Sequence, residues 1–408
     1  MTIRDLQYSL IFSGLIIVPF LSYGELVALF SGTLPGQDQN LTGWFKASKD
    51  LIFLLLIFLG SAGYLLSNNI KHKSLSYLLI VIVAIAPSII LSLQNQFIYT
   101  ASGLRWLIPV ILPFFIYSVV DEALVKKIAK YLIVLLILHF CVQVLQTFYA
   151  SSWYGVSSMG INLRNPGLFL IPNTASFFTI ISLYFILYFA DVNKLKKMFL
   201  IIISTASVFL TMSGAGVVVL LTLLLIYYFQ FKKFIKFFPL ILPAAIGLGF
   251  VFISVLLSSR PEDYLSVSGG VRLSILTNSF NNAHFFSDIF GYGTNTAIIV
   301  ANGFSVDSTF ASLVVNLGYF GFFIFMCLFL AVGVYSILNK FEPLFALLVI
   351  VFLYSGTNII FEVYPVSLLL AILVAFFMKR RAAAIAARKC KVLAENIPHS
   401  KVSSHTII

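Results

Sequence analysis

Residues Met198–Phe231 read MFLIIISTASVFLTMSGAGVVVLLTLLLIYYFQF, an apolar run of 34 residues with lysines on both sides. A single helix of this length would measure about 50 Å, whereas the hydrocarbon core of a bilayer is about 30 Å thick. Lysine-rich flanks favour the cytoplasmic side, so the run requires an even number of crossings. Ser213-Gly214-Ala215-Gly216 offers a break near its middle. The run is therefore predicted to be a hairpin of two short membrane helices.

Pro343–Met378 shows the same pattern, with Lys340 before it, Lys379-Arg380-Arg381 after it, and Ser355-Gly356 and Pro365 inside. It is predicted to be a second hairpin. Eight further apolar runs each have the length of one span. These two hairpins and eight single spans add up to about 12 crossings. The single spans are Tyr8–Phe30, Leu51–Leu66, Leu75–Leu93, Leu104–Val120, Tyr131–Phe148, Gly167–Ala190, Phe238–Leu257 and Ser308–Leu338.

The composition excludes a soluble enzyme. Of 408 residues, 60% are hydrophobic and only 10% are charged, whereas about a quarter of the residues of a soluble domain are charged. The first apolar stretch, Leu10 to Phe30, is too long for a signal-peptide core and lacks a small-residue cleavage site, so it is expected to stay as a helix. The three cysteines, at 141, 327 and 390, show neither metal-ligand nor disulfide spacing.

The net charge of +12 is interpreted through membrane orientation and not through nucleic-acid binding. With both termini in the cytoplasm, the twelve-span topology places 20 of the 26 basic residues on the inner side. We therefore predict an all-α polytopic integral membrane protein with both termini cytoplasmic. The six outward basic residues are Lys46, Lys49, Arg105, Arg164, Arg260 and Arg272.

The domain organisation predicted from these patterns is simple. Residues 1–378 form a single transmembrane domain, and residues 379–408 form a basic cytoplasmic tail suited to contact with anionic membrane lipids. The inner loops are short and lysine-rich, whereas outer loops are expected at about 31–50, 150–166 and 258–307. Long loops without structure of their own are uncommon unless they are functional. Any chemistry is therefore expected on the outer face.

Four of the six outward basic residues are arginines, whereas 16 of the 20 inner ones are lysines. A guanidinium grips phosphate oxygens through parallel hydrogen bonds and stays charged when it is partly desolvated. Outward arginines near the membrane surface suit the diphosphate of a lipid carrier. The alternative is that they extend to lipid headgroups or pair with the acidic residues Glu262, Asp263 and Asp288.

Candidate general bases also lie on the outer side. Asp307 precedes the span Ser308–Leu338, where it could deprotonate a sugar hydroxyl. The alternative is local: Asp307 or Ser308 caps the helix, and Gly318 and Gly321 permit close helix contact.

Two further outward residues, His284 and Glu362, are also candidate bases. Gly291-Tyr292-Gly293 is interpreted as a turn, because it does not have the context of a nucleotide-binding loop. The intramembrane residues Glu25 and His139 are functional candidates by their position alone.

The C-terminal half resembles the O-antigen polymerase and ligase superfamily, multi-span bacterial enzymes that transfer lipid-linked sugar chains in the periplasm. The resemblance covers roughly Leu200 to Phe377 and rests on Thr211-Met212-Ser213-Gly214 at a helix break, Arg272 in the large outer loop, Gly291-Tyr292-Gly293 and the segment from Asp307 to Gly321. Twelve spans with main outer loops at 150–166 and 258–307 resemble the Wzy-type polymerases.

Two departures from the superfamily pattern bear on the activity. Ligases carry a histidine, a small polar residue, nine residues, a glycine, two residues and a closing glycine, threonine or tyrosine. Here Ser308, Gly318 and Gly321 fit that spacing, but Asp307 stands at the histidine position, which favours a polymerase. Many members also have a basic residue after the serine at the helix break, where this chain has Gly214.

The resemblance implies a glycosyltransferase of the bacterial inner membrane with a periplasmic active face. It would polymerise oligosaccharide repeat units carried on undecaprenyl diphosphate, with donor and acceptor both lipid-linked. The implied diphosphate-binding residues are Arg272, Arg164 and Arg260, and the implied base is Asp307, with His284 or Glu362 as alternatives. No cofactor or metal is expected, and further partners would be membrane lipids, a chain-length regulator and a flippase.

Three other activities remain open at this stage. An O-antigen ligase would transfer finished polymer to lipid A core. A lipid-linked oligosaccharide flippase is expected to have charges in the bundle interior and little need for a 50-residue outer loop. A channel or purely structural protein is compatible with the composition, although the set of motifs favours the polymerase over it.

Overall fold

The computed structural model describes residues 2–21, 39–67, 72–92, 97–149, 157–158, 161–162, 164–169, 171–229, 243, 247, 289–291, 293, 308–361 and 363–395. Apart from a ladder of two short antiparallel strands, these segments form helices and their connections. The elements are α1 (Ile3–Ile16), η1 (Val18–Phe20), α3 (Gln39–Ser67), α4 (His72–Ser92), α5 (Phe97–Ile116), α6 (Glu122–Tyr149), β1 (Ser157–Ser158), β2 (Ile161–Asn162), α7 (Pro172–Phe189), α8 (Lys194–Leu210), α9 (Gly214–Tyr228), α14 (Thr309–Leu338), α15 (Glu342–Ser355) and α16 (Val366–Glu395).

Among the described residues, six helical segments are long and apolar enough to cross a membrane. Large side chains on these helices point outward, among them Phe58 and Phe323, which are 68% and 67% exposed. Contiguous exposed apolar surface of this kind is suited to lipid and not to water. The protein is therefore a helical membrane protein. The six segments are Ile3–Phe20, Ala47–Leu66, Leu75–Ser92, Glu122–Phe148, Pro172–Phe189 and Thr309–Leu338.

The break predicted inside Met198–Phe231 is confirmed. Helix α8 ends at Leu210, and α9 begins at Gly214 with Ser213 as its N-cap. The Ser213 side chain accepts a hydrogen bond from the Gly216 amide, which satisfies one free donor of the first turn. The second predicted break is also confirmed, because α15 ends at Ser355 and α16 begins at Val366.

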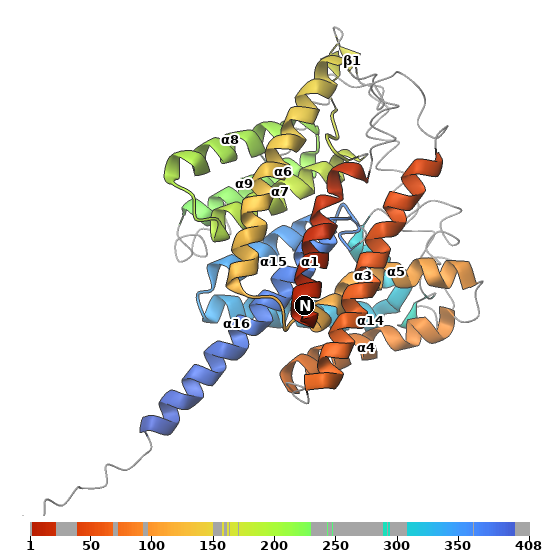
Figure 1. The fold of residues 1–408 in the computed structure, drawn as a ribbon, viewed down its shortest axis with the longest axis vertical. Coiled ribbons are helices and arrows are strands. Elements are labelled where there is room, and N and C mark those ends of the chain that lie inside the picture. The colour runs from red at the N-terminus through yellow and green to blue at the C-terminus, as the bar shows by residue number, and fades with distance from the viewer. Residues whose placement is uncertain are drawn as a thin grey trace, which may run out of the picture.

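Some element boundaries differ from those expected. Helix α3 begins at Gln39, inside the segment 31–50 that was expected to be a loop. Its first turns are polar but free of proline, so nothing in the sequence stops the helix from extending beyond the apolar run. Helix α16 likewise continues through residue 378 to Glu395, because the alanine-rich stretch that follows favours a helix. It projects from the body of the molecule (Figure 1).

Helix α7 lies at the centre of one group of helices, α6–α9, while α4, α5 and α14 form another (Figure 1). Nearly every residue of α7 is buried. Helices α15 and α16 connect the two groups, since α15 packs against α9 and α14, and α16 packs against α5, α6 and α7. A membrane helix surrounded by protein on all sides can hold polar side chains, because they face partners and not lipid.

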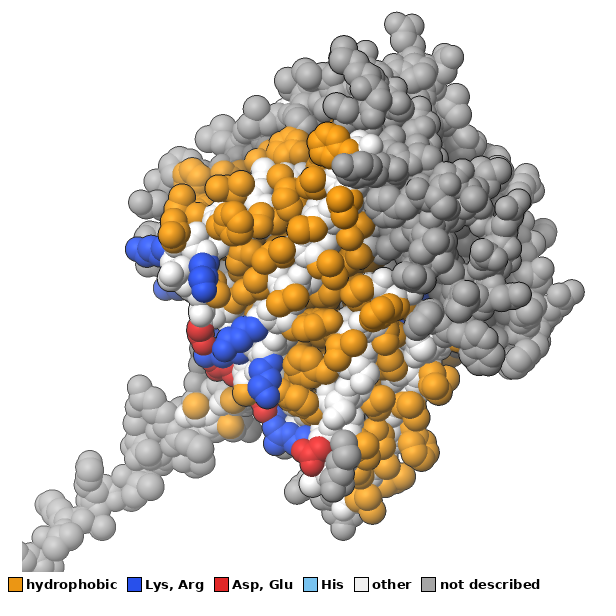
Figure 2. All heavy atoms as spheres, turned by 45° about the horizontal axis from the view of Figure 1, so that its top comes forward, with side chains coloured by type: hydrophobic (Ala, Val, Ile, Leu, Met, Phe, Trp, Pro, Cys, Tyr) orange, Lys and Arg blue, Asp and Glu red, His pale blue; other side chains and the backbone are white. Residues whose placement is uncertain are grey.

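Charged side chains from four chain segments meet at one end of the bundle, named here the charged end. Arg4 pairs with Asp121 at 2.5 Å, and Lys126 reaches Asp191 at 3.4 Å. Lys379 Nζ donates to the carbonyl of Val120 at 2.9 Å. The charged side chains form a row along one edge of a broad hydrophobic face (Figure 2). The residues grouped by these contacts all belong to segments that the sequence predicts to be cytoplasmic.

Candidate functional site

The opposite end of the bundle, named here the polar end, consists of the C-terminal ends of α6, α8 and α15 and the N-terminal ends of α7, α9 and α14. Arg164 lies here and is half-buried. It precedes a short segment, residues 165–169, that contains a turn in which the Phe169 amide donates to the Pro166 carbonyl. The backbone N–H of Asn165 donates to the carbonyl of Leu210 at 2.8 Å. The segment with Arg164 is thus attached directly to the last turn of α8.

Two glutamines of α6 hold this segment in place. Gln146 donates to the Gly167 carbonyl at 3.0 Å and accepts from the Gly167 amide at 2.7 Å, so a single side chain satisfies both backbone groups. Gln143 donates to the carbonyl of Asn165 at 3.0 Å. The backbone at Gly167 has a φ of +60°, and a Cβ there would overlap the His139 ring, so only glycine fits.

His139 lies one turn before Gln143 on α6. Its Nδ1 accepts a hydrogen bond from the Leu168 amide at 3.2 Å, and its ring packs against Phe169 and Phe178. Since Nδ1 is the acceptor, Nε2 carries the proton of the neutral ring. Nε2 is buried and makes no hydrogen bond within the part of the chain that the structure describes. His139 therefore positions residues 165–169 from inside the bundle.

A second layer of polar contacts joins α7, the α8–α9 break and α15. Ser213 Oγ donates to Asn173 Oδ1 at 3.0 Å, and the Tyr354 hydroxyl donates to the Asn173 carbonyl at 2.8 Å. Ser176 contacts the same tyrosine hydroxyl. The Tyr354 ring stacks on Phe177 with centroids 4.1 Å apart. All of these side chains except Asn173 are buried, so the layer is a rigid, satisfied network.

The network continues to the start of α14. Ser308 caps this helix by accepting from the Ala311 amide, and its hydroxyl donates to the Ser355 carbonyl at 3.0 Å. Thr309 donates its backbone N–H to the Asn358 carbonyl at 3.0 Å and accepts from the Ile360 amide at 3.0 Å. The alternative reading of Ser308 as a helix cap is thereby confirmed. Thr309 therefore lies beside Asn358 and Ile360.

Gly318 interrupts α14 with a φ of +67°, and the segment from Ile289 to Gly291 lies directly against this kink. A Cβ on Gly318 would overlap the Ile289 carbonyl, and one on Gly291 would overlap the backbone of Asn316. Gly291 and Gly293 both have positive φ, in agreement with the predicted turn. The close contact expected of Gly318 and Gly321 is confirmed: Gly318 lies against the segment from Ile289 to Gly291, and a Cβ on Gly321 would be 3.2 Å from the Ala84 carbonyl oxygen of α4.

Two amide side chains have buried polar atoms without partners. Asn316 lies two residues before the kink, whereas Asn358 lies beside Thr309 at the start of α14. Asn316 Oδ1 and Asn358 Nδ2 make no hydrogen bond to any residue that the structure describes. Buried polar atoms are normally satisfied, so each is a candidate for contact with a polar ligand.

Of the six residues predicted to bind or act on the substrate, the structure describes Arg164. The other five, Arg260, Arg272, His284, Asp307 and Glu362, lie outside the described residues, as do Glu25 and Tyr292. The structure brings residues 165–169 after Arg164, the break at Ser213 and the helix start at Ser308 to the same end of the bundle. Within the described residues, no group of three His, Cys, Asp or Glu side chains is placed to hold a metal ion.

Five residues with hydrogen bonds at the polar end were not predicted from the sequence: Gln143, Gln146, Asn173, Ser176 and Tyr354. A signal for the first two exists, because His139, Gln143 and Gln146 are spaced four and three residues apart in an apolar helix and so share one face. Their partners are backbone groups of a distant segment, which no spacing rule reveals. Comparisons with protein-family models, curated proteins and solved structures give no match to this chain.

Proposed function

We propose that the protein is a glycosyltransferase that polymerises oligosaccharide repeat units carried on undecaprenyl diphosphate, with its active site at the polar end. One observation supports this above the others. Hydrogen bonds join Asn165 to Leu210, Ser213 to Asn173, Tyr354 to Asn173, and Ser308 to Ser355, the residue after Tyr354. The segment after Arg164, the helix break at Ser213 and the start of α14 after Asp307 are thereby connected, although they are far apart in the chain.

The proposed reaction uses arginines and one base. Arg272, Arg164 and Arg260 bind the diphosphate of the donor and stabilise the charge that develops on it as the leaving group. Asp307, or alternatively His284 or Glu362, takes the proton from the acceptor hydroxyl. The bond between the reducing-end sugar carbon and the diphosphate oxygen breaks, and a bond from that carbon to the acceptor oxygen forms. Undecaprenyl diphosphate leaves without its saccharide.

The buried amide atoms of Asn316 and Asn358 support this proposal from the described part of the chain. Asn358 lies beside the start of α14, where the acceptor sugar would enter, and Asn316 lies two turns into that helix. An amide oxygen and an amide N–H suit sugar hydroxyls, each of which donates and accepts. The charged end is proposed to face the cytoplasm, which places the polar end on the periplasmic side of a bacterial inner membrane.

Deletion of the gene is expected to leave single repeat units, visible on a gel of surface polysaccharide, in place of a ladder of long chains. Plasmid-borne wild-type protein should restore the ladder. Long polymer that accumulates on undecaprenyl diphosphate would instead identify a ligase. A complete loss of both single units and polymer, with lipid-linked units retained inside the cell, would identify a flippase. Either of these results would contradict the proposal.

A further inference from the structure

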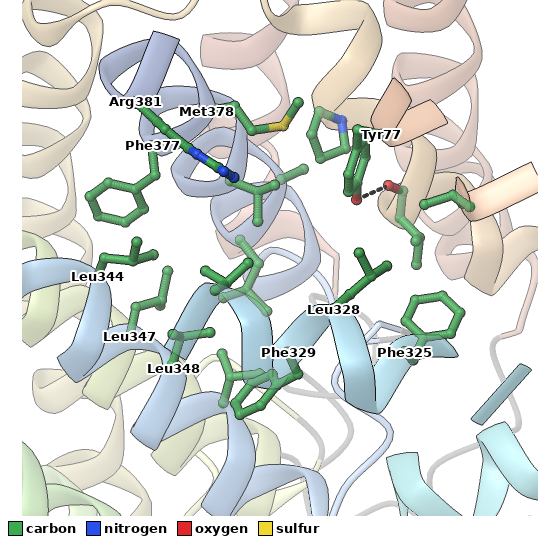
Figure 3. Close-up of a pocket in the computed structure, with 18 of the residues that line it drawn as sticks. Tyr77, Phe325, Leu328, Phe329, Leu344, Leu347, Leu348, Phe377, Met378 and Arg381 are labelled. Carbon is green, nitrogen blue, oxygen red and sulfur yellow. Dashed lines mark hydrogen bonds between the residues drawn. The ribbon is translucent and has the colours of Figure 1, made fainter. Parts of the chain in front are cut away.

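A cavity of about 600 Å³ lies between α4, α5, α14, α15 and α16 (Figure 3). Its wall is almost entirely apolar, and includes Phe325, Leu328, Leu347 and Val374. Ligand-binding cavities in proteins commonly measure about 300 to 1,000 Å³. The volume is therefore that of a small-molecule or lipid site and exceeds the gaps left by ordinary packing.

The cavity is elongated. Residues of α16 line it from Ser367 to Ile385, a helical length of about 27 Å at 1.5 Å per residue. Carbon atoms in van der Waals contact lie about 4 Å apart, so a hydrocarbon chain is thin enough to lie along this length. The shape and the apolar wall thus suit an extended acyl chain.

One cationic side chain lines the cavity, at the charged end of the bundle. Arg381 extends from α16 toward the middle of the lining side chains (Figure 3). Its guanidinium lies over the ring of Tyr335 with 4.7 Å between the central carbon and the ring centroid. A cation–π contact does not occupy the N–H donors of a guanidinium, which can still donate to phosphate oxygens.

We propose that this cavity binds one acyl chain of an anionic phospholipid whose phosphate contacts Arg381. Basic side chains between membrane helices at the cytoplasmic surface recognise such headgroups. The positive charge of Arg381 favours an anionic over a zwitterionic lipid. The second acyl chain would lie in the bilayer outside. Arg381, which would contact the phosphate, lies at the charged end and not at the polar end, so this inference does not depend on the proposed reaction.

The test uses full-length protein purified in detergent, stripped of lipid and titrated with phosphatidylglycerol, with native mass spectrometry to count bound lipids. One phosphatidylglycerol per chain is expected, with at least about tenfold weaker binding of phosphatidylcholine. Arg381→Ala should weaken phosphatidylglycerol binding about tenfold. Arg380→Ala is the matched control, because Arg380 also lies over an aromatic ring, that of Phe341, but does not line the cavity.

A second pair of variants tests the apolar part without touching charge. Val332 lines the cavity, whereas Val334 on the same helix is 54% exposed. Val332→Trp should abolish lipid retention, and Val334→Trp should leave it unchanged. Equal binding of phosphatidylcholine, equal losses in the two arginine variants, or full retention by Val332→Trp would overturn the proposal. Tighter binding of undecaprenyl phosphate than of phosphatidylglycerol would also overturn it, because the occupant would then be a carrier lipid.

Discussion

Arg164→Ala is expected to lower the polymerisation rate in membrane vesicles at least about 100-fold, because each preorganised donor to a developing anion contributes on this scale. The measurement follows incorporation of radiolabelled lipid-linked repeat units into polymer. Arg164 is half-buried at the polar end, and the segment that follows it is held by Gln143 and Gln146. Because the backbone next to Arg164 is fixed, less freedom is lost when its guanidinium binds a phosphate.

Arg164→Lys should give an intermediate rate, because it keeps the charge but loses the paired N–H groups of the guanidinium. Lys196→Ala is the matched control. Lys196 lies in the first turn of α8, next to the charged end and far from the proposed reaction. Its side chain is exposed. Each variant must reach the membrane at the wild-type level. An alanine variant of Arg164 that polymerises at the wild-type rate would exclude the residue from the site.

Gly318→Ala is expected to destabilise the protein by about 3 to 5 kcal/mol. The backbone at Gly318, with φ +67° and ψ −174°, is in a region that only glycine adopts at low cost, and an added Cβ would also overlap the Ile289 carbonyl. Strain of this kind costs about 1 to 3 kcal/mol, and overpacking adds a similar amount. The melting temperature of the detergent-solubilised protein should fall by about 10 °C.

Gly333→Ala provides the control for this experiment, since Gly333 lies in the same helix and a Cβ there would have no neighbour within 4 Å. Alanine is the better helix former by about 1 kcal/mol, so this variant should melt at or above the wild-type temperature. If Gly318→Ala melted within a degree or two of Gly333→Ala, the backbone contact between α14 and the segment from Ile289 to Gly291 would not exist.

The helical hairpins could be predicted because two independent constraints act on them. Met198–Phe231 is too long for one span and has lysines on both flanks, and small residues at Ser213 to Gly216 allow the turn. Element ends that depend on helix propensity alone were harder to predict. The start of α3 at Gln39 and the end of α16 at Glu395 both lie in polar stretches beyond the apolar runs. The change in hydropathy therefore does not mark either helix end.

The candidate site was predictable only in part. Gly318 and Ser308 were recognised from local rules of close packing and capping, and both have those roles. The glutamines that hold residues 165–169 were not recognised, because a polar residue in an apolar helix has no visible partner in a single sequence. The partner of Gln146 is the backbone of Gly167, which is positioned by a positive φ that depends on the folded environment.

Reconstitution of the purified protein in liposomes tests the central claim most directly. With lipid-linked repeat units as the sole substrate, saccharides of two or more units on one carrier should form, together with free undecaprenyl diphosphate in equal amount to the new bonds. Protein with Arg164→Ala, Arg260→Ala and Arg272→Ala combined should form neither. Substrate that crosses the bilayer without any new glycosidic bond would contradict the account.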